Sequence, residues 1–179
     1  MGFELALIHR LQVLFPGVVG HEIVLILARY IVFLLVAFVA ILAMRAQQKG
    51  LRHAAREAIF SGLLALYAAL LLSGWIHRLR PFAVSPEILR LIPTPLSEFS
   101  LPSAHASAAF GLAFPIVFTS RRMGIVAGGL AILVALGRVL AGVHYPSDVL
   151  AGALVGFAAF TVVRLMHLAL RRTRFTHHV

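Results

Sequence analysis

Five long apolar stretches dominate this sequence and constrain its fold more than any other feature. They cover residues 22–44, 58–76, 102–119, 123–143 and 146–170. A helix needs about 20 predominantly apolar residues to cross a hydrocarbon layer roughly 30 Å thick. We therefore predict an all-α fold, a multi-pass transmembrane helical bundle of about five spanning helices.

The composition supports this class and excludes others. With 61% hydrophobic and 12% charged residues, the chain does not resemble an ordinary soluble domain. A net charge of +10 would suggest nucleic acid binding in a soluble protein, but most Lys and Arg residues here lie in short loops between apolar stretches, so no nucleic-acid partner is expected. The absence of cysteine excludes disulfides, thiolate metal sites and thiol nucleophiles.

Basic residues follow alternate apolar stretches, which predicts the topology. An excess of Lys and Arg marks cytoplasmic loops. The clusters after the first, third and fifth stretches contain Arg45, Lys49, Arg52, Arg56, Arg121, Arg122, Arg171, Arg172 and Arg174. The N-terminus then lies outside and the C-terminus inside, in the plasma or inner membrane. The loop 77–101 and the turn near His144 share the outer, periplasmic or extracellular, face.

The first 20 residues predict an interfacial helix. Apolar residues such as Leu5 and Ile8 recur at helical spacing among polar ones, as in helices that lie on a membrane surface. Packing of this helix against the bundle is an equally consistent alternative. Glu4 and Arg10 within the apolar stretch, and the lack of a basic start, argue against a cleavable signal peptide.

We interpret residues 1–179 as a single domain. It comprises the interfacial helix (1–20), the helical bundle (21–170) and a basic cytoplasmic tail (171–179). The external loop 81–101 mixes several prolines with an apolar run, which predicts a semi-rigid lid lying on the bilayer surface.

Three polar clusters fall on the outer face. The first, His77-Arg78-Leu79-Arg80-Pro81-Phe82, ends the second stretch. The guanidinium of Arg80 offers a fork of donors that suits phosphate oxygens. Arginines that extend their side chains to the lipid headgroups are the alternative interpretation.

The second cluster, Leu101-Pro102-Ser103-Ala104-His105, begins the third stretch. Pro102 suits the first position of a helix, whose unpaired backbone N–H groups can bind an anion. Ser103 adds a hydroxyl, and the His105 imidazole could donate a proton to a leaving oxygen. A purely structural histidine remains the alternative for His105.

The third cluster contains Arg138, His144 and Asp148, the only aspartate of the chain. Arg138 interrupts an apolar stretch, and an ionisable group at membrane depth is a functional hypothesis by default. Pro146 suits the start of the fifth helix. Asp148 would accept the imidazole N–H of His144 and leave the other ring nitrogen as a nucleophile. A helix cap is the alternative for Asp148.

Together, these groups suit phosphoryl transfer. Two arginines and two helix starts can bind the equatorial oxygens, one imidazole can attack phosphorus, and the other can protonate the leaving oxygen. Nothing in these clusters resembles a metal cage, so neither a metal ion nor a cofactor is expected at this site.

The order and spacing of the three motifs resemble the type-2 phosphatidate phosphatase superfamily. The resemblance covers residues 73–152. It implies that His144 forms a phosphohistidine, Asp148 orients His144, and His105 protonates the departing lipid-linked oxygen. It further implies a metal-free phosphate pocket formed by Arg80, Ser103, the backbone N–H of Ala104, and Arg138.

Two positions depart from the superfamily pattern. Ser73 stands where a lysine is usual, and Gly137 stands where a serine is usual. The missing lysine, the Arg-Pro-Phe run and the small size resemble the bacterial bacitracin-resistance undecaprenyl-pyrophosphate phosphatases. We expect Arg78 or His77 to replace the missing phosphate donor.

The resulting prediction is a membrane lipid phosphatase that acts at the outer leaflet, with a lipid-linked phosphate as substrate and membrane lipids around it. Undecaprenyl pyrophosphate is the leading substrate. Phosphatidylglycerophosphate, phosphatidate and lipid A phosphate are alternatives with the same chemistry. A non-catalytic lipid carrier or a haem-binding bundle is a different class, and the position of His105 and His144 near prolines disfavours haem.

Overall fold

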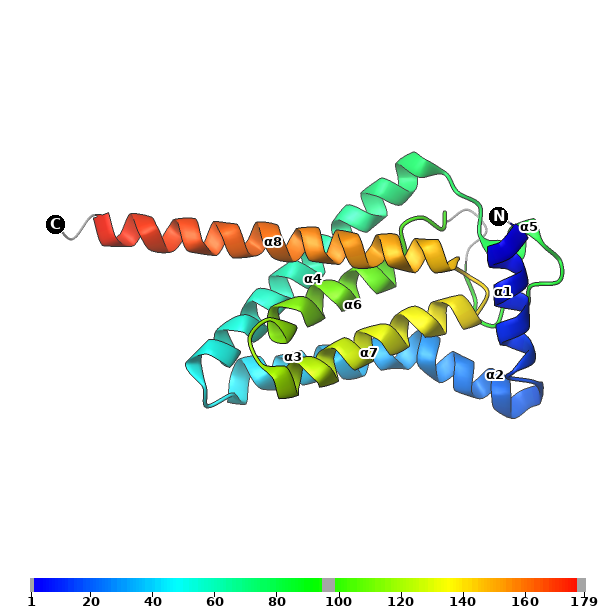
Figure 1. Ribbon diagram of the computed structural model, residues 1–179, viewed down its shortest axis with the longest axis horizontal. Helices are drawn as coiled ribbons and strands as arrows, with labels where there is room; N and C mark the ends of the chain where they lie inside the picture. The colour runs from blue at the N-terminus through cyan, green and yellow to red at the C-terminus, as the bar shows by residue number, and fades with distance from the viewer. Residues whose placement is uncertain (1, 95–98, 177–179) are drawn as a thin grey trace.

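The computed structural model describes residues 2–94 and 99–176, and side chains through residue 170. All regular secondary structure in these ranges is helical, which confirms the predicted all-α class (Figure 1). The helices are α1 (Gly2–Val13), α2 (Gly17–Leu25), the π-helix η1 (Ile26–Tyr30), α3 (Ile31–Arg45), α4 (Lys49–Ile76), α5 (Pro81–Val84), α6 (Ala104–Val117), α7 (Arg121–Leu140) and α8 (Pro146–Thr176).

Four helical stretches of the described chain are long and apolar enough to cross a membrane. They are Gly17–Arg45, Lys49–Val84, Arg121–Leu140 and Pro146–Leu170. The remaining predicted span, residues 102–119, corresponds to α6, which has only 14 residues. This short helix packs against α4, α7 and α8, so its place is the interior of the bundle.

The main core forms where α3, α4, α6 and α7 meet. Its members include Leu35, Val39, Ala58, Ile116 and Val134. Large apolar side chains also point outward, among them Phe33, Leu63 and Leu154. An apolar outer surface is expected where a bundle contacts lipid tails, because no water is present there to favour polar groups.

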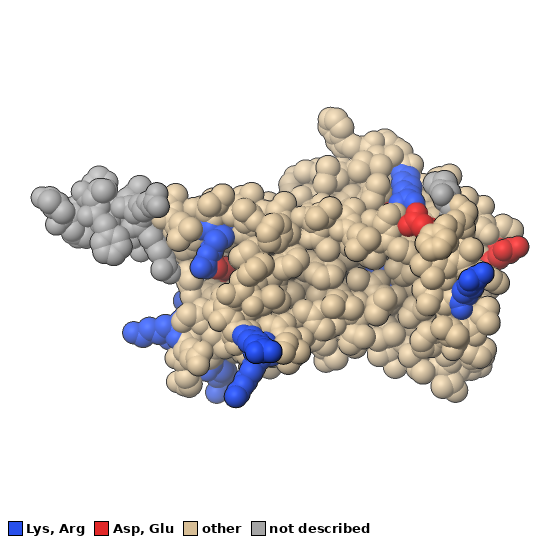
Figure 2. Space-filling model, in the orientation of Figure 1, with Lys and Arg blue, Asp and Glu red and all other residues tan. Residues whose placement is uncertain are grey.

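Basic side chains gather at one end of the bundle. Figure 2 shows several of them where the α3–α4 and α6–α7 connections lie. The helix ends beside these connections carry the exposed residues Arg45, Lys49, Arg121 and Arg122. The opposite end carries α1, α5 and the segment before α6 (Figure 1). The two ends therefore differ in charge as the loop pattern predicts; which end faces the cytoplasm stays a prediction.

Helix α1 lies across the second end, transverse to the long helices (Figure 1). Ile8 is fully buried in a cluster with Ile88, Val139 and Tyr145. Phe3, in contrast, is 81% exposed. The helix thus packs on the bundle with one face and presents apolar side chains outward with another; its position on a membrane surface stays a prediction.

The segment after α5 packs on the end of the bundle; its position at the bilayer surface stays a prediction. Ile88 and Ile92 are buried. The N–H of Leu91 donates to the carbonyl of Ala141 at 3.1 Å. Gly142 has φ +73°, and a Cβ there would lie 2.3 Å from the Leu89 carbonyl oxygen. The described part of this segment is therefore held by backbone contacts with the end of α7.

The buried side chain of Gln12 joins three elements at this end. Its Nε2 donates to the carbonyls of Leu89 at 2.8 Å and Leu140 at 3.0 Å. Its Oε1 accepts from the N–H of Leu89 at 3.1 Å. One amide therefore links α1, the segment after α5 and the end of α7.

We expect Gln12→Ala to lower the free energy of unfolding by roughly 1–3 kcal/mol, because it leaves backbone groups of Leu89 and Leu140 buried without partners. Thermal unfolding of the detergent-solubilised protein measures this. Gln47→Ala, at an exposed position of the α3–α4 turn, is the matched control. Equal midpoints for the two variants would contradict the assigned role of Gln12.

Candidate active site

A cavity of about 430 Å³ lies at the end of the bundle that carries α1. Its wall brings together residues from all three polar clusters: Arg80, Pro102, Ala104, His105, Arg138 and His144. Ser73 of α4 also lines it. Leu66, Leu70 and Phe99 add an apolar side. The convergence predicted from the topology is therefore observed for most of the candidate residues.

His144 is held in one tautomer by a backbone carbonyl. Its Nδ1 lies 2.8 Å from the carbonyl oxygen of Ser100. Because a carbonyl can only accept, Nδ1 carries the hydrogen and Nε2 keeps its lone pair. Nη1 of Arg80 lies 3.4 Å from Nε2. The ring nitrogen suited to nucleophilic attack therefore lies beside a guanidinium in the cavity wall.

Asp148 has a different hydrogen bond from the one predicted. Its Oδ2 lies 3.6 Å from Nδ1 of His144 and accepts the N–H of Tyr145 at 2.8 Å. The N–H of Asp148 in turn donates to the Tyr145 carbonyl at 3.0 Å. This reciprocal pair caps the start of α8. The carboxylate acts on the imidazole as a neighbouring charge, because Ser100 already accepts its N–H.

Arg78 binds the other oxygen of Asp148. Its Nη1 donates to Oδ1 at 2.7 Å and to the Ser147 hydroxyl at 2.7 Å, and its Nη2 donates to Glu4 at 3.0 Å. Its guanidinium also lies 3.9 Å from the ring centroid of Tyr145. The expectation that Arg78 supplies the missing phosphate donor is therefore wrong, because its donors serve carboxylates outside the cavity.

The backbone of Arg78 also positions Ser100. Its carbonyl accepts the N–H of Ser100 at 2.8 Å and the Ser100 hydroxyl at 3.2 Å. Arg78 thus connects the Asp148 carboxylate with the carbonyl that orients His144. Sequence reasoning missed Ser100, because a backbone carbonyl leaves no signal in residue type.

His77 does not replace the missing donor either. It ends α4 in the left-handed conformation with φ 52°, and its Nδ1 lies 3.0 Å from the carbonyl of Trp75. Its ring packs edge-on against Phe99, and it is not part of the cavity wall. Ser73, at the usual lysine position, does line the cavity, and its hydroxyl donates to the Leu70 carbonyl at 3.0 Å.

The two phosphate-binding candidates Arg80 and Arg138 reach the cavity from different parts of the chain. Arg80 precedes α5 and donates to the carbonyl of Val143 at 3.1 Å. Arg138, in the last turn of α7, donates to the carbonyl of Ala28 in η1 at 3.3 Å. Both are largely buried, so their charges lie in a setting of low dielectric where they attract an anion strongly.

Gly137 lets η1 approach α7 closely. A Cβ at this position would lie 2.5 Å from the carbonyl carbon of Leu27 and 2.6 Å from the nitrogen of Ala28. A serine, usual in the superfamily pattern, has no room there. This departure therefore brings the carbonyl of Ala28 within reach of the neighbouring Arg138.

The second cluster begins α6 later than expected. The helix starts at Ala104 with Ser103 as its N-cap, so Pro102 precedes the helix and is not its first residue. The Ser103 hydroxyl accepts from the N–H of Ala106 at 3.5 Å. Ser103 is fully buried and is not part of the cavity wall. Its contact with phosphate stays a prediction, whereas Ala104 and the exposed His105 do face the cavity.

The surroundings of His144 keep its imidazole neutral. Burial lowers the pKa of His144 from 6.5 to about 4; the nearby carboxylate of Asp148 opposes this shift, and the positive charges of Arg138 and Arg80 add to it. At neutral pH, Nε2 therefore has an available lone pair. Two guanidiniums, a helix start and this imidazole can bind a tetrahedral oxyanion and attack its central atom.

Comparison with known proteins agrees with this geometry. The sequence matches the PAP2 superfamily over residues 54–172, which is more than half of the chain. The chain belongs to the PAP2 superfamily. This confirms the resemblance inferred from the three motifs, since all of them lie within the matched residues.

Curated PAP2 relatives cover part of the chain. The bacitracin transport permease protein BcrC of Bacillus licheniformis is 38% identical over 46% of this chain and 41% of its own length. An undecaprenyl-diphosphatase of Sulfolobus acidocaldarius is 42% identical over 44% and 38%. Phosphatidylglycerophosphatase B of Bacillus subtilis is 32% identical over 58% and 53%. The chain therefore spans about half the length of such relatives, or less.

Solved structures show the same fold. LpxE of Aquifex aeolicus has a TM-score of 0.64 at 23% identity, covering 89% of this chain and 91% of its own. The first transmembrane PAP2 type phosphatidylglycerolphosphate phosphatase of Bacillus subtilis has a TM-score of 0.65 at 24% identity, covering 94% and 86%. The helical arrangement is thus that of membrane-embedded PAP2 proteins.

We expect Gly137→Ala to destabilise the protein by several kcal/mol, because the added methyl group meets backbone atoms that cannot rotate away. Thermal unfolding in detergent measures the effect. Gly129→Ala, on the same helix with no atom within 4 Å of the added Cβ, is the control and should be neutral or stabilising. Similar midpoints for both variants would contradict the close approach of η1.

The lowered pKa of His144 predicts a pH-dependent stability difference. Between pH 6.5 and about 4, the unfolded chain binds a proton at this residue and the folded chain does not. The folded state therefore loses roughly 3 kcal/mol as pH falls through this window. His144→Gln removes this loss, so its unfolding free energy relative to wild type should rise from pH 7 to pH 4. A difference that stays constant with pH would overturn the assignment.

Proposed function

We propose that this protein is a lipid phosphatase that works through a phosphohistidine at His144. One observation carries the proposal: Nε2 of a buried, neutral imidazole lies 3.4 Å from Arg80 in a cavity that Arg138 also lines. The nucleophile and the anion-binding groups are therefore assembled before substrate binds, which is the arrangement that lowers a phosphoryl-transfer barrier.

Each cavity residue has a task in the proposed reaction. Nε2 of His144 attacks phosphorus, while Arg80, Arg138 and the backbone start of α6 at Ala104 stabilise the equatorial oxygens. His105 donates a proton to the departing oxygen, and water then hydrolyses the phosphohistidine. The guanidiniums supply the positive charge, so the proposed chemistry requires no metal ion.

An apolar groove supports a lipid substrate. It has a volume of about 390 Å³, and its wall comes mostly from α3 and α4. The lining residues are Val32, Phe33, Val36, Val39, Ala40, Ile59, Gly62, Leu63, Leu66, His105, Ala108 and Leu112. The groove shares Leu66 and His105 with the phosphate cavity. A hydrocarbon chain in the groove would leave its phosphate beside His105 and His144.

Undecaprenyl pyrophosphate, hydrolysed to undecaprenyl phosphate at the outer leaflet, is the substrate we propose. The Arg-Pro-Phe run after α4 and the relatives named for bacitracin transport and undecaprenyl diphosphate support it. Phosphatidylglycerophosphate is the main alternative, supported by the Bacillus subtilis relative. Phosphatidate and lipid A phosphate share the same chemistry. The basic end of the bundle would face the cytoplasm and the cavity the outside.

We expect His144→Ala to abolish phosphate release while the protein still folds, with a cooperative thermal transition at a midpoint that the loss of the buried imidazole lowers. Purified protein is assayed with undecaprenyl pyrophosphate, phosphatidylglycerophosphate and phosphatidate in one detergent, in the presence of a chelator. His9→Ala, an exposed histidine on α1, is the control and should retain full turnover. Turnover by His144→Ala at the wild-type rate would eliminate the proposed nucleophile.

The same panel separates the alternatives. Preference for the pyrophosphate by the ratio kcat/KM supports the undecaprenyl substrate, and preference for a glycerophospholipid refutes it without refuting the reaction class. Lipid transfer between vesicles without phosphate release would indicate a carrier. An acid-labile, base-stable phosphate label that is absent from His144→Ala is the expected signature of the phosphohistidine.

A further inference from the structure

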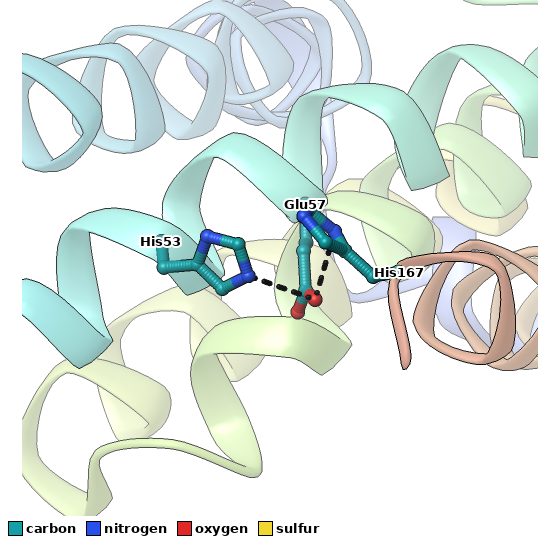
Figure 3. Close-up of side chains that lie close together, drawn as sticks. All are labelled: His53, Glu57 and His167. Carbon is teal, nitrogen blue, oxygen red and sulfur yellow. Dashed lines mark ion pairs between the residues drawn. The ribbon is translucent and has the colours of Figure 1, made fainter. Parts of the chain in front are cut away.

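A second cluster of ionisable side chains lies at the basic end of the bundle, away from the phosphate cavity. Figure 3 shows His53 and Glu57 from α4 together with His167 from α8, all directed toward one another. Glu57 is only 1% exposed, while the two histidines are partly exposed. The proposed phosphatase reaction does not use this cluster.

One oxygen of Glu57 lacks a hydrogen bond. Oε2 accepts from Nη1 of Arg164 at 2.9 Å, but Oε1 is buried without a hydrogen-bond partner in the described part of the chain. Nε2 of His53 and Nδ1 of His167 lie 3.4 and 3.3 Å from Oε1; these contacts are ion pairs when the imidazoles are protonated, but they are not hydrogen bonds. A buried carboxylate oxygen is costly in this state, and a bound ion would account for it.

The three atoms have the separations of metal ligands. Oε1 of Glu57, Nε2 of His53 and Nδ1 of His167 all lie within 4.8 Å of one another. Bonds of about 2.0–2.1 Å to a tetrahedral Zn²⁺ place the ligand atoms about 3.3–3.4 Å apart. The two nitrogen–oxygen separations already have this length, and a rotation of the partly exposed imidazoles shortens the third.

We propose that His53, Glu57 and His167 bind a transition-metal ion of the Zn²⁺ class. Two imidazoles and one carboxylate favour Zn²⁺ or Co²⁺ over Mg²⁺ or Ca²⁺, which prefer oxygen ligands. Arg164 holds Oε2 and leaves Oε1 for the metal, as outer partners do in metal sites. Because Arg164 already neutralises the single carboxylate, a hard cation bound by charge alone gains little.

The site would connect α4 to α8. Two ligands come from consecutive turns of α4 and the third from the distant end of α8. Binding to the folded arrangement alone stabilises it. A bound ion would therefore stabilise the contact between α4 and α8 at the basic end. It has no part in the phosphoryl transfer proposed for the opposite end.

Metal binding to the purified protein tests this inference. A tag-free protein in which His177 and His178 are replaced by Ala is stripped with a chelator, dialysed and titrated with Co²⁺. We expect one equivalent to bind with visible absorption bands typical of low coordination number, and Zn²⁺ to displace it. A hundredfold excess of Zn²⁺ over Kd should raise the unfolding midpoint by about 5 °C or more, whereas Mg²⁺ should not.

Matched variants identify the ligands. His167→Ala and His53→Ala should each weaken Co²⁺ binding by at least about tenfold. His21→Ala, another partly buried histidine but on α2, should bind as the parent does. If Glu57→Gln does not fold, these two histidine variants still decide the outcome. Absence of saturable binding, or equal binding by all variants, would mean that the cluster is an ion-pair network only and would overturn the proposal.

Discussion

Pairing of the buried Asp148 carboxylate organises the cavity end of the bundle. Asp148 is 0% exposed, and a buried charge without partners would cost several kcal/mol. Arg78 and the amide of Tyr145 satisfy it. Because Arg78 also binds Glu4 and, through its backbone, Ser100, one pairing connects α1, the end of α4, the segment before α6, and α8. The orientation of the His144 imidazole depends on that connection.

Close approach of two backbone segments places the guanidinium of Arg138 on the other side of the cavity. Arg138 is positioned by the carbonyl of Ala28, and that contact exists because Gly137 leaves room for η1. The π-helix and the glycine belong to different spans. Only together do they position Arg138. Gly137, although it departs from the superfamily pattern, therefore still serves the phosphate cavity. A π turn beside a functional group is a recurrent arrangement in helical proteins.

Helices α4 and α8 both extend from the cavity end to the basic end, and each end has its own set of ionisable groups. At the cavity, guanidiniums outnumber carboxylates and an anion is favoured. At the basic end, Glu57 gathers Arg164 and two imidazoles around one buried carboxylate, which favours a cation with affinity for nitrogen. In an apolar bundle, buried charges persist only where such partners converge. The two clusters therefore mark the two ends of the bundle at which charged side chains are buried together with partners.

The sequence by itself determined the helical class, the approximate spans, the alternation of the loops and most members of the candidate site, because hydropathy, charge and motif spacing act over short distances along the chain. It also placed Pro146 correctly at the start of α8. Only the tertiary structure decided that Ser100, not Asp148, accepts the His144 N–H, that Arg78 serves a carboxylate rather than phosphate, and that Glu57 meets His167. Those partners are separated by 44, 70 and more than 100 residues in sequence, and their pairing depends on how the whole bundle packs.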